Sequence, residues 1–500
     1  MNVIYVYKIS EFQAKGNQID ISKKIAKDFF NISEEDIKNG NNISVNVCHI
    51  SNLTNFDTIE IQPAGNIRWS TSLNTYLAKK EGTPIQGGDL LVVEKIGRSF
   101  CVWTLKNGDS KYDVLLSLFD EKETSLLLTV VMKEIDFTKI PTSYTEYISA
   151  IRTKPFILLA GISGTGKSRI VRQLARACDN LDDNPWTMQK PMNFEMIQVK
   201  PNWHDSSELL GYVSRIDGEK FVAGDFLKFI VKAWENPGTP FFLCLDEMNL
   251  APVEQYFAEY LSVIESRRLN EYGEVVTDPI VRRDDAPWYS ILVKNLTKDQ
   301  DLRDKFEKEG ISIPQNLVVM GTVNMDETTF SFSRKVLDRA MTIEMNEVDL
   351  KGGLTEDDLK KEQFTIAAAD ILPKAVEGKD VYEGNKELCD KVIEYLGDVN
   401  NVLEGTPFKI AYRTRNEFLI YAVNRGETNY AKAMDEMTSM KILSRIEGDD
   451  VKMLNADGNN VLDGLKTQVE KLGLAEESVS LKKIAEMKKR LASGYTSYWS

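Results

Sequence analysis

The sequence predicts an α/β core built around a phosphate-binding loop, with a β-rich α+β domain before it and a helical region after it. Residues 161–168 read G-I-S-G-T-G-K-S and follow the apolar run 156–160, which is the strand-and-loop pattern of a nucleotide site. A second apolar run, 241–245, ends in two adjacent carboxylates. These observations give three expected domains, at residues 1–135, 136–350 and 351–500.

The loop has the chemistry of a phosphate cradle. Its glycines let the backbone curl so that several N–H groups point at one phosphate, beside the positive end of the next helix dipole. Lys167 is expected to reach the β- and γ-phosphates, and Ser168 to ligate Mg²⁺. A chance glycine loop is the alternative, but the apolar strand before it and the apolar helix face after it argue against that. The expected nucleotide-binding residues are Gly161, Gly164, Thr165, Gly166, Lys167 and Ser168.

The two carboxylates at the end of the second apolar run are Asp246 and Glu247. Asp246 is expected to hold Mg²⁺ through water, and Glu247 to polarise the water that attacks the γ-phosphate. A strand end with two solvated acids is the alternative. The catalytic interpretation is favoured because the pair follows a phosphate-binding loop in the same chain.

The composition limits the other chemistry that the chain can perform. Its 500 residues carry a net charge of −14, so any basic surface must be local. The five cysteines are scattered and show no C-x-x-C, which indicates reduced thiols and a cytoplasmic setting. Only His49 and His204 are present, which disfavours histidine triads and histidine-rich metal sites. No run approaches the roughly 18 apolar residues that a membrane span needs, so no membrane partner is expected.

Residues 1–135 read as short β-rich runs separated by turns. Positions 1–140 hold 16 basic and 18 acidic residues, so this part is nearly neutral. Arg68 and Trp69 combine a cation with an aromatic ring and are candidates for contact with duplex DNA, although a half-buried Trp with solvated neighbours fits as well. Asp89 and Glu94-Lys95 faintly resemble a metal-dependent nuclease core but lack its carboxylate-x-lysine spacing.

A third buried strand is expected at 317–324, ending in Asn324, which is placed to sense the γ-phosphate and help position water. Arg339 follows a short helical segment and can project into the next subunit's nucleotide site, where its planar cation would stabilise charge on the transferring phosphoryl group. A surface salt bridge is the alternative for Arg339, and the favoured interpretation for Arg334 and Lys335. The charged insertion 268–315 is expected to form a surface element with a hairpin around Tyr272-Gly273, for which a position facing a central pore is one option.

The C-terminal region is expected to be mostly helical. Amphipathic patterns predict helices over residues 388–403, from Tyr412 onward, and over 481–491. The basic residues between Lys482 and Arg490 are interpreted as a solvated face, with a DNA or partner contact as the minority alternative.

Taken together, the motifs resemble a known family. The order of the phosphate-binding loop, D-E-M-N, G-T-V-N-M-D, D-R-A and A-Y-R-T-R-N-E is similar to that of AAA+ proteins of the McrB branch, the NTPase motors of modification-dependent restriction systems. M-K-I-L-S-R-I-E-G and the ending R-L-A-S-G-Y-T-S-Y-W support the same branch. The resemblance covers roughly residues 140–500. The first two motifs are specific only to P-loop NTPases, whereas the combined set is specific to the branch.

The resemblance implies a role for each matching residue. GTP-using members carry M-N-x-x-D-R after the fourth core strand, whereas this chain reads V-N-M-D-E-T, so the nucleotide is expected to be GTP or ATP. The implied roles are nucleotide and Mg²⁺ ligands for Lys167 and Ser168, the Walker B pair for Asp246 and Glu247, the first sensor for Asn324, the trans-acting finger for Arg339 and a second sensor in the helical lid for Arg413.

The resemblance also implies a function. It predicts a ring, expected to be a hexamer, that senses or moves along duplex DNA for a separate McrC-like nuclease in defence against phage and other foreign DNA. The N-terminal domain would then recognise the target. A MoxR-like or dynein-related ATPase that remodels a protein partner is the main alternative. A nucleotide-gated DNA-binding switch with negligible turnover is a third.

Overall fold

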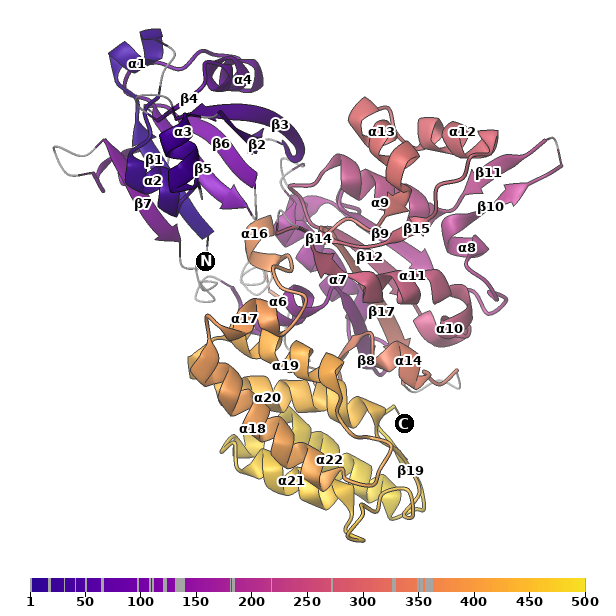
Figure 1. Cartoon of the computed structure of the whole chain (residues 1–500). Coiled ribbons are helices and arrows are strands. Elements are labelled where there is room, and N and C mark those ends of the chain that lie inside the picture. Colours follow the sequence, from indigo (N-terminus) through magenta and orange to yellow (C-terminus); the bar gives the residue numbers. More distant parts are fainter. Residues whose placement is uncertain are drawn as a thin grey trace. The chain divides into compact units, whose positions relative to one another are not determined.

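The computed structural model describes residues 2–499 apart from short gaps at 17–18, 31, 41, 50–51, 64–66, 97–98, 108, 110–111, 120–123, 131–139, 180, 182–184, 217, 271–272, 326–329, 349, 351–353 and 356–362. The chain forms two compact units (Figure 1). The first contains Met1–Lys133 with Asn270–Gly273, and the second contains Glu134–Leu269 with Glu274–Ser500.

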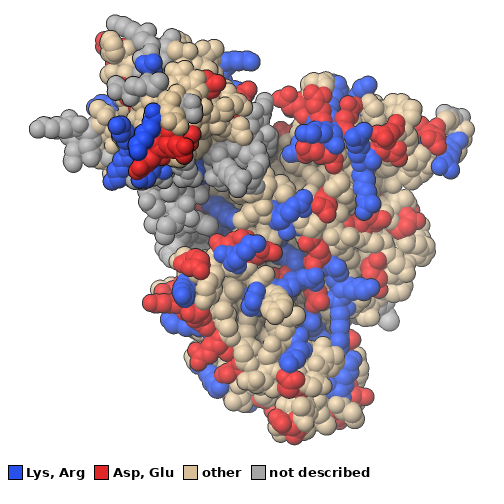
Figure 2. All heavy atoms as spheres, viewed as in Figure 1, with Lys and Arg blue, Asp and Glu red and all other residues tan. Residues whose placement is uncertain are grey.

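The first unit is built on a seven-stranded sheet in the order β4-β3-β2-β6-β5-β1-β7. All neighbouring strands are antiparallel except β2 and β6. Acidic and basic side chains are interspersed on the viewed face of this unit (Figure 2). Its elements are β1 Asn2–Lys8, α1 Glu11–Gly16, α2 Lys23–Asp28, α3 Glu34–Asn39, β2 Ile43–His49, β3 Asn52–Gln62, β4 Arg68–Trp69, α4 Ser72–Glu81, β5 Leu90–Ile96, β6 Ser99–Leu105, α5 Tyr112–Leu116 and β7 Ser125–Val130.

An aromatic cluster fills the larger core of this unit and includes Trp69. Trp69 is 1% exposed, and its ring packs edge-to-face on Phe30 with centroids 5.2 Å apart. The predicted contact of the Trp69 ring with DNA is therefore wrong, because the ring is enclosed by apolar side chains. Arg68 is half-buried beside it on the edge strand β4. Within the described residues, no three acidic, His or Cys side chains are grouped to hold a metal.

The second unit contains a five-stranded parallel sheet in the order β18-β8-β17-β12-β9. Alternate residues of β8 enter two different cores, as the period of a strand requires. Helices α6 and α7 contribute to the core that contains Ile157, and α9, α10 and α11 to the core that contains Leu158. These elements are α6 Thr142–Thr153, β8 Phe156–Gly161, α7 Lys167–Cys178, β9 Phe194–Gln198, α9 Asp225–Glu235, β12 Phe241–Asp246, α10 Val253–Tyr256, α11 Ala258–Val263, β17 Leu317–Asn324, α14 Arg334–Leu337 and β18 Met341–Glu344.

A hairpin and an insertion are attached to this core. A hairpin of β10 Gly211–Ser214 and β11 Lys220–Ala223, preceded by α8 Ser207–Leu210, was not predicted. In the insertion, Phe306 is buried against Trp234, and the Trp234 Nε1 donates to the Ser312 carbonyl at 2.8 Å, so one face of it packs on the core. Tyr272 of the expected hairpin lies outside the described residues. The insertion comprises β13 Arg268–Leu269, β14 Val275–Val276, β15 Pro279–Val281, α12 Pro287–Leu296, α13 Gln300–Glu309 and β16 Ile311–Ser312.

The C-terminal region of the second unit is a bundle of helices, orange to yellow in Figure 1. The helices predicted at 388–403, from Tyr412 and at 481–491 are present as α18, α19 and α22. None of the described helices has the length and apolar character needed to cross a membrane. The region comprises α16 Ala368–Ile371, α17 Lys379–Tyr382, α18 Lys386–Val402, α19 Tyr412–Arg425, α20 Tyr430–Met437, the π-helical turn η6 Thr438–Ile442, the 3₁₀ turn η7 Leu443–Arg445, α21 Val461–Glu470 and α22 Val479–Leu491.

Candidate nucleotide-binding site

The predicted site residues converge because of the strand order. β17 lies between β8 and β12, and all three strands run parallel. Their carboxyl ends therefore meet at one edge of the sheet, which is where parallel α/β sheets bind ligands. The phosphate-binding loop follows β8, Asp246 ends β12 and Asn324 ends β17.

The loop adopts a conformation that needs its glycines. Gly164 and Gly166 have φ angles of 85° and 86°, in the left-handed region that side chains rarely enter. Gly161 has a different constraint, because a Cβ there would lie 2.6 Å from the carbonyl oxygen of Met345. Helix α7 begins at Lys167, directly after the loop, so its free N–H groups face the loop.

Lys167 is the cation of this cradle. The residue is 6% exposed, and its ammonium donates to the carbonyls of Gly161 at 3.0 Å and Ile162 at 2.7 Å. The Thr165 hydroxyl also donates to the Ile162 carbonyl, at 3.1 Å. These bonds hold the loop in its curved conformation and keep the positive charge beside the loop backbone.

Asp246 is oriented by two hydroxyl groups. Its Oδ1 accepts a hydrogen bond from the Ser168 Oγ at 2.8 Å and another from the Thr322 Oγ1 at 2.8 Å. The backbone N–H of Glu247 donates to the same Thr322 oxygen at 2.9 Å. Thr322 was not among the residues predicted for the site. Its signal was available, because Thr322 and Asn324 are polar residues two positions apart in an apolar strand and so share one side of the sheet.

Glu247 lies beside Asn324. The Asn324 Nδ2 donates to the Glu247 Oε1 at 3.3 Å. Glu247 also has a φ of 53°, a left-handed value that a residue with a side chain seldom adopts. Such strained positions cluster at functional sites, where the surrounding structure enforces them. The structure thus brings the predicted sensor and the predicted base together.

The donor set fits Mg²⁺ bound with a nucleotide. A serine hydroxyl and one carboxylate are hard oxygen ligands, and Mg²⁺ is usually held by one or two carboxylates together with substrate phosphates. Ser168 and Asp246 are already hydrogen-bonded to each other, so they face the same point.

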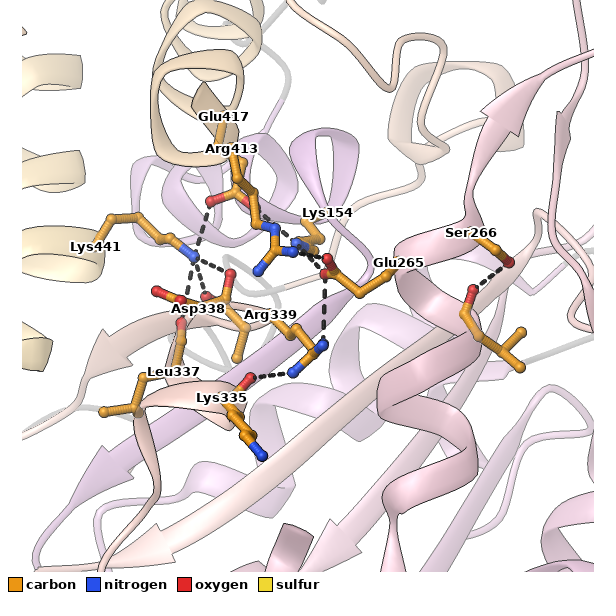
Figure 3. A network of polar contacts seen from close by, with 12 residues as sticks. Lys154, Glu265, Ser266, Lys335, Leu337, Asp338, Arg339, Arg413, Glu417 and Lys441 are labelled. Carbon is orange, nitrogen blue, oxygen red and sulfur yellow. Dashed lines mark hydrogen bonds and ion pairs between the residues drawn. The ribbon is translucent and has the colours of Figure 1, made fainter. Parts of the chain in front are cut away.

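Arg339 and Arg413 lie elsewhere. Arg339 comes just before β18, at the opposite end of the parallel sheet from the phosphate-binding loop. Its Nε is 3.7 Å from the Glu265 Oε1, and the Arg413 guanidinium forms an ion pair with the same carboxylate (Figure 3). Lys154, two residues before β8, is 3.6 Å from Glu265. Since β8 spans roughly 16 Å at about 3.3 Å per residue, neither arginine is at its own subunit's loop.

Comparisons with known proteins show what the two halves of the second unit resemble. A model of the AAA domain of the dynein-related subfamily matches residues 156–306, and one of a domain of unknown function, DUF8727, matches residues 365–495. The type IV methyl-directed restriction enzyme EcoKMcrB subunit of Escherichia coli (strain K12) is 20% identical over 306 residues, which are 61% of this chain and 56% of that protein. The chain contains an AAA domain and is similar to the McrB subunit. The predicted α/β P-loop core is confirmed, and the chain spans just over half of the length of this relative.

Two solved structures share weaker similarity with this McrB-like chain. The N-terminal domain of Helicobacter pylori LlaJI.R1 is 21% identical, with a TM-score of 0.21, covering 26% of this chain and 98% of that one. The SCCmec type IV Cch active helicase is 13% identical, with a TM-score of 0.23, covering 70% of this chain and 51% of that one. Neither TM-score supports a comparison of folds.

Proposed function

We propose that this McrB-like chain hydrolyses GTP or ATP in sites shared between copies of a ring, expected to be a hexamer. In this proposal the ring serves as the DNA-sensing or DNA-translocating motor of a restriction system with an McrC-like nuclease. The supporting observation is the array of Ser168, Asp246 and Thr322 beside Glu247 and Asn324. The similarity to the methyl-directed restriction enzyme subunit of E. coli supports the defence role.

The residues divide the chemistry between them. Ser168 and Asp246 would hold Mg²⁺, which when bound neutralises charge on the β- and γ-phosphates. Glu247 polarises the attacking water, and the Asn324 amide holds the Glu247 carboxylate in place for that task. Lys167 exchanges its loop carbonyls for phosphate oxygens, to which an ammonium binds more strongly than to a neutral carbonyl.

The second half of the site comes from a neighbouring copy in this proposal. Arg339 is too far from its own loop to contact its own nucleotide, but a head-to-tail ring brings one end of each sheet to the opposite end of the next. Arg339 then reaches the neighbour's γ-phosphate, and Arg413 accompanies it because both guanidinium groups bind Glu265. This assigns the predicted lid sensor, Arg413, to the neighbour's nucleotide.

Thr322 provides a test of the metal site. Thr322→Val removes the hydroxyl that donates to Asp246 and accepts from the Glu247 N–H. Losing such support beside a metal ligand is expected to raise the Mg²⁺ concentration needed for half-maximal nucleotide binding by about 10-fold. The measurement is a Mg²⁺ titration of fluorescent-nucleotide binding, with hydrolysis as a second readout.

Thr342→Val is the matched control. Thr342 lies in β18 of the same sheet, is fully buried, and its hydroxyl bonds to no described residue. This variant should titrate like the wild type. If both variants require the same Mg²⁺ concentration as the wild type, Thr322 does not organise the site.

We assign duplex DNA recognition to residues 1–135. The region is nearly neutral within a chain of net charge −14, so phosphate repels it least. Arg68, on the edge strand β4, remains the candidate for a phosphate contact, whereas Trp69 supports that strand from inside. The expected setting is the cytoplasm, where such DNA would be met.

Duplex DNA is expected to increase the rate of nucleotide hydrolysis by the full chain, and Arg68→Ala to weaken DNA binding. Binding should also weaken as salt rises, because it releases counterions from the phosphates. Fluorescence anisotropy with unmodified and methylated duplexes, at low and moderate salt, measures the binding. Absence of binding to any duplex at low salt would contradict this role.

A protein-remodelling ATPase is the second candidate, and the match to the dynein-related AAA subfamily favours it. Under that alternative, hydrolysis responds to a protein partner and not to DNA. A DNA-binding switch, the third possibility, would show negligible turnover under every condition. Hydrolysis assays with and without DNA therefore separate the three.

A further inference from the structure

A buried lysine of the C-terminal helical region contacts the segment that carries Arg339. Lys441 lies in the π-helical turn η6 and is 0% exposed. Its ammonium donates to the carbonyls of Leu337 at 3.3 Å, Asp338 at 3.0 Å and Ala340 at 2.8 Å (Figure 3). Those carbonyls lie on both sides of Arg339 along the chain.

The cation satisfies carbonyls at and just after the end of α14. Helix α14 ends at Leu337, and the last carbonyls of a helix have no partner within the helix. A positive charge at a helix C-terminus is also favourable to the helix dipole. The Lys441 ammonium has three N–H donors and faces four acceptor oxygens, those of the three carbonyls and of Glu417. Its whole hydrogen-bonding capacity is therefore used there.

Glu417 balances the charge of Lys441. This carboxylate is buried on α19 and binds Lys441 at 2.8 Å and Lys154 at 2.7 Å. Burial raises the pKa of Glu417, but attraction to the two lysines outweighs it and leaves the pKa below its ordinary value. Burial lowers the pKa of Lys441 to about 8 against the attraction of Glu417, so the ammonium is still mostly protonated at pH 7.

A second cation reinforces the contact. Arg445 ends the 3₁₀ turn that follows η6, and its Nε is 3.2 Å from the Oδ1 of Asp338, the residue directly before Arg339. By contrast, the Arg339 side chain itself has weak local support, with one bond to the Lys335 carbonyl at 2.9 Å and the long pair with Glu265. The C-terminal helical region therefore binds the carbonyls on both sides of Arg339 and the side chain of Asp338.

We propose that Lys441 is a positioning residue for Arg339, which fixes the backbone from Leu337 to Ala340 so that the guanidinium is presented to the neighbouring copy's nucleotide. This inference rests on the proposed function of Arg339 at a shared site. In this proposal, the C-terminal helical region of one copy affects nucleotide hydrolysis in the next copy. It does not affect nucleotide binding in its own copy.

The direct test is Lys441→Met, which keeps the length of the side chain and removes its donors. Turnover is expected to fall by about 10²-fold, the effect of misplacing a catalytic group by roughly 1 Å. Binding of a fluorescent non-hydrolysable nucleotide should be unchanged. Lys466→Met is the control, because Lys466 is half-exposed on α21 and, among the described residues, pairs with Glu470 alone. Wild-type turnover by Lys441→Met would overturn the proposal.

Mixed assemblies show where Lys441 acts. A Lys441→Met copy would have an intact phosphate-binding loop and a misplaced arginine. Mixing it with Lys167→Ala copies should restore hydrolysis, whereas mixing it with Arg339→Ala copies should not. The reverse pattern would show that Lys441 serves its own copy's site, and would overturn the proposal.

A mixture of Lys167→Ala and Arg339→Ala copies separates the two hypotheses, the shared nucleotide site and the positioning role of Lys441. If Lys167→Ala and Arg339→Ala copies restore each other, the shared site stands and the Lys441 mixtures decide the inference. If the parents co-assemble without restoring each other, the shared site itself fails and the inference fails with it. Should Lys441→Met not fold, Arg445→Gln replaces it in the same mixtures, because this variant removes the partly exposed pair between Arg445 and Asp338. The same pattern is expected, and the reverse pattern again overturns the proposal.

Discussion

Glu247→Gln is expected to bind nucleotide with normal affinity and to hydrolyse it about 10²- to 10⁴-fold more slowly than the wild type, the usual loss when a general base is removed. The glutamine keeps the shape of the side chain and the position beside Asn324, but it cannot accept a proton from water. The left-handed backbone of Glu247 and the bond between its N–H and Thr322 do not depend on the carboxylate, so the site should keep its geometry. Steady-state hydrolysis and equilibrium nucleotide binding measure the two effects separately.

Glu309→Gln is the control for this variant, because Glu309 is an exposed carboxylate at the end of α13 in the insertion. It should hydrolyse nucleotide at the wild-type rate. Trapped nucleotide should also stabilise the assembled ring in the Glu247→Gln variant, since the site is shared in this proposal. A wild-type hydrolysis rate for Glu247→Gln would show that another group activates the water.

Arg339→Ala is expected to lower turnover by about 10³-fold, as for other arginines that stabilise the charge of a transferring phosphoryl group. The fold should survive, because the side chain makes only one hydrogen bond, to the Lys335 carbonyl, and a long ion pair with a partly exposed carboxylate. Exposed ion pairs contribute at most about 1 kcal/mol, so thermal unfolding should change little. Turnover, nucleotide binding and thermal unfolding together test this expectation.

Two variants control for charge at this position. Arg339→Lys keeps the charge but loses the planar fork, so it should recover little activity. Arg334→Ala removes a cation from α14, the short helix that precedes Arg339. The Arg334 guanidinium lies over the Phe408 ring and donates to the Pro407 carbonyl at 3.4 Å. This variant should retain most of the turnover. Equal losses in Arg339→Ala and Arg334→Ala would indicate a general effect of surface charge.

The nucleotide core could be predicted from the sequence because its signals are local. The strand predicted at 317–324 is observed as Leu317–Asn324, and the run before Asp246 is observed as β12. Such strands are buried on both faces and read as continuous apolar runs. The loop and the acidic pair are short motifs at their ends, so the parallel order of the strands alone brings them together.

The network around Glu265 and Glu417 could not be predicted. Its members come from segments far apart in the chain, such as Lys154 and Glu417 or Lys441 and Asp338, and only the tertiary fold makes them neighbours. A retrospective signal exists in M-K-I-L, where Lys441 interrupts an apolar run. A charge in such a run is buried with partners or is not buried at all.

The predicted contact of Trp69 with DNA was wrong because the local sequence misled. Its neighbours in the sequence are polar, which suggested a surface, yet the strand pair β3–β4 turns its ring into the aromatic core. The face of a two-residue strand is decided by its register with β3, which local sequence does not encode. Arg68, its neighbour on the alternate face, therefore keeps its candidate role when Trp69 loses it.

Hydrolysis by mixtures of Arg339→Ala and Lys167→Ala copies tests the shared site most directly. Each variant alone is expected to be nearly inactive, because one lacks the trans arginine and the other lacks the phosphate-binding lysine. In a mixed ring, an Arg339→Ala copy with an intact loop can stand next to a Lys167→Ala copy with an intact arginine. The rate should therefore rise on mixing and peak near equal proportions. A rate that stays at the sum of the parents at every ratio, while mass measurements show mixed assemblies, would contradict the shared site.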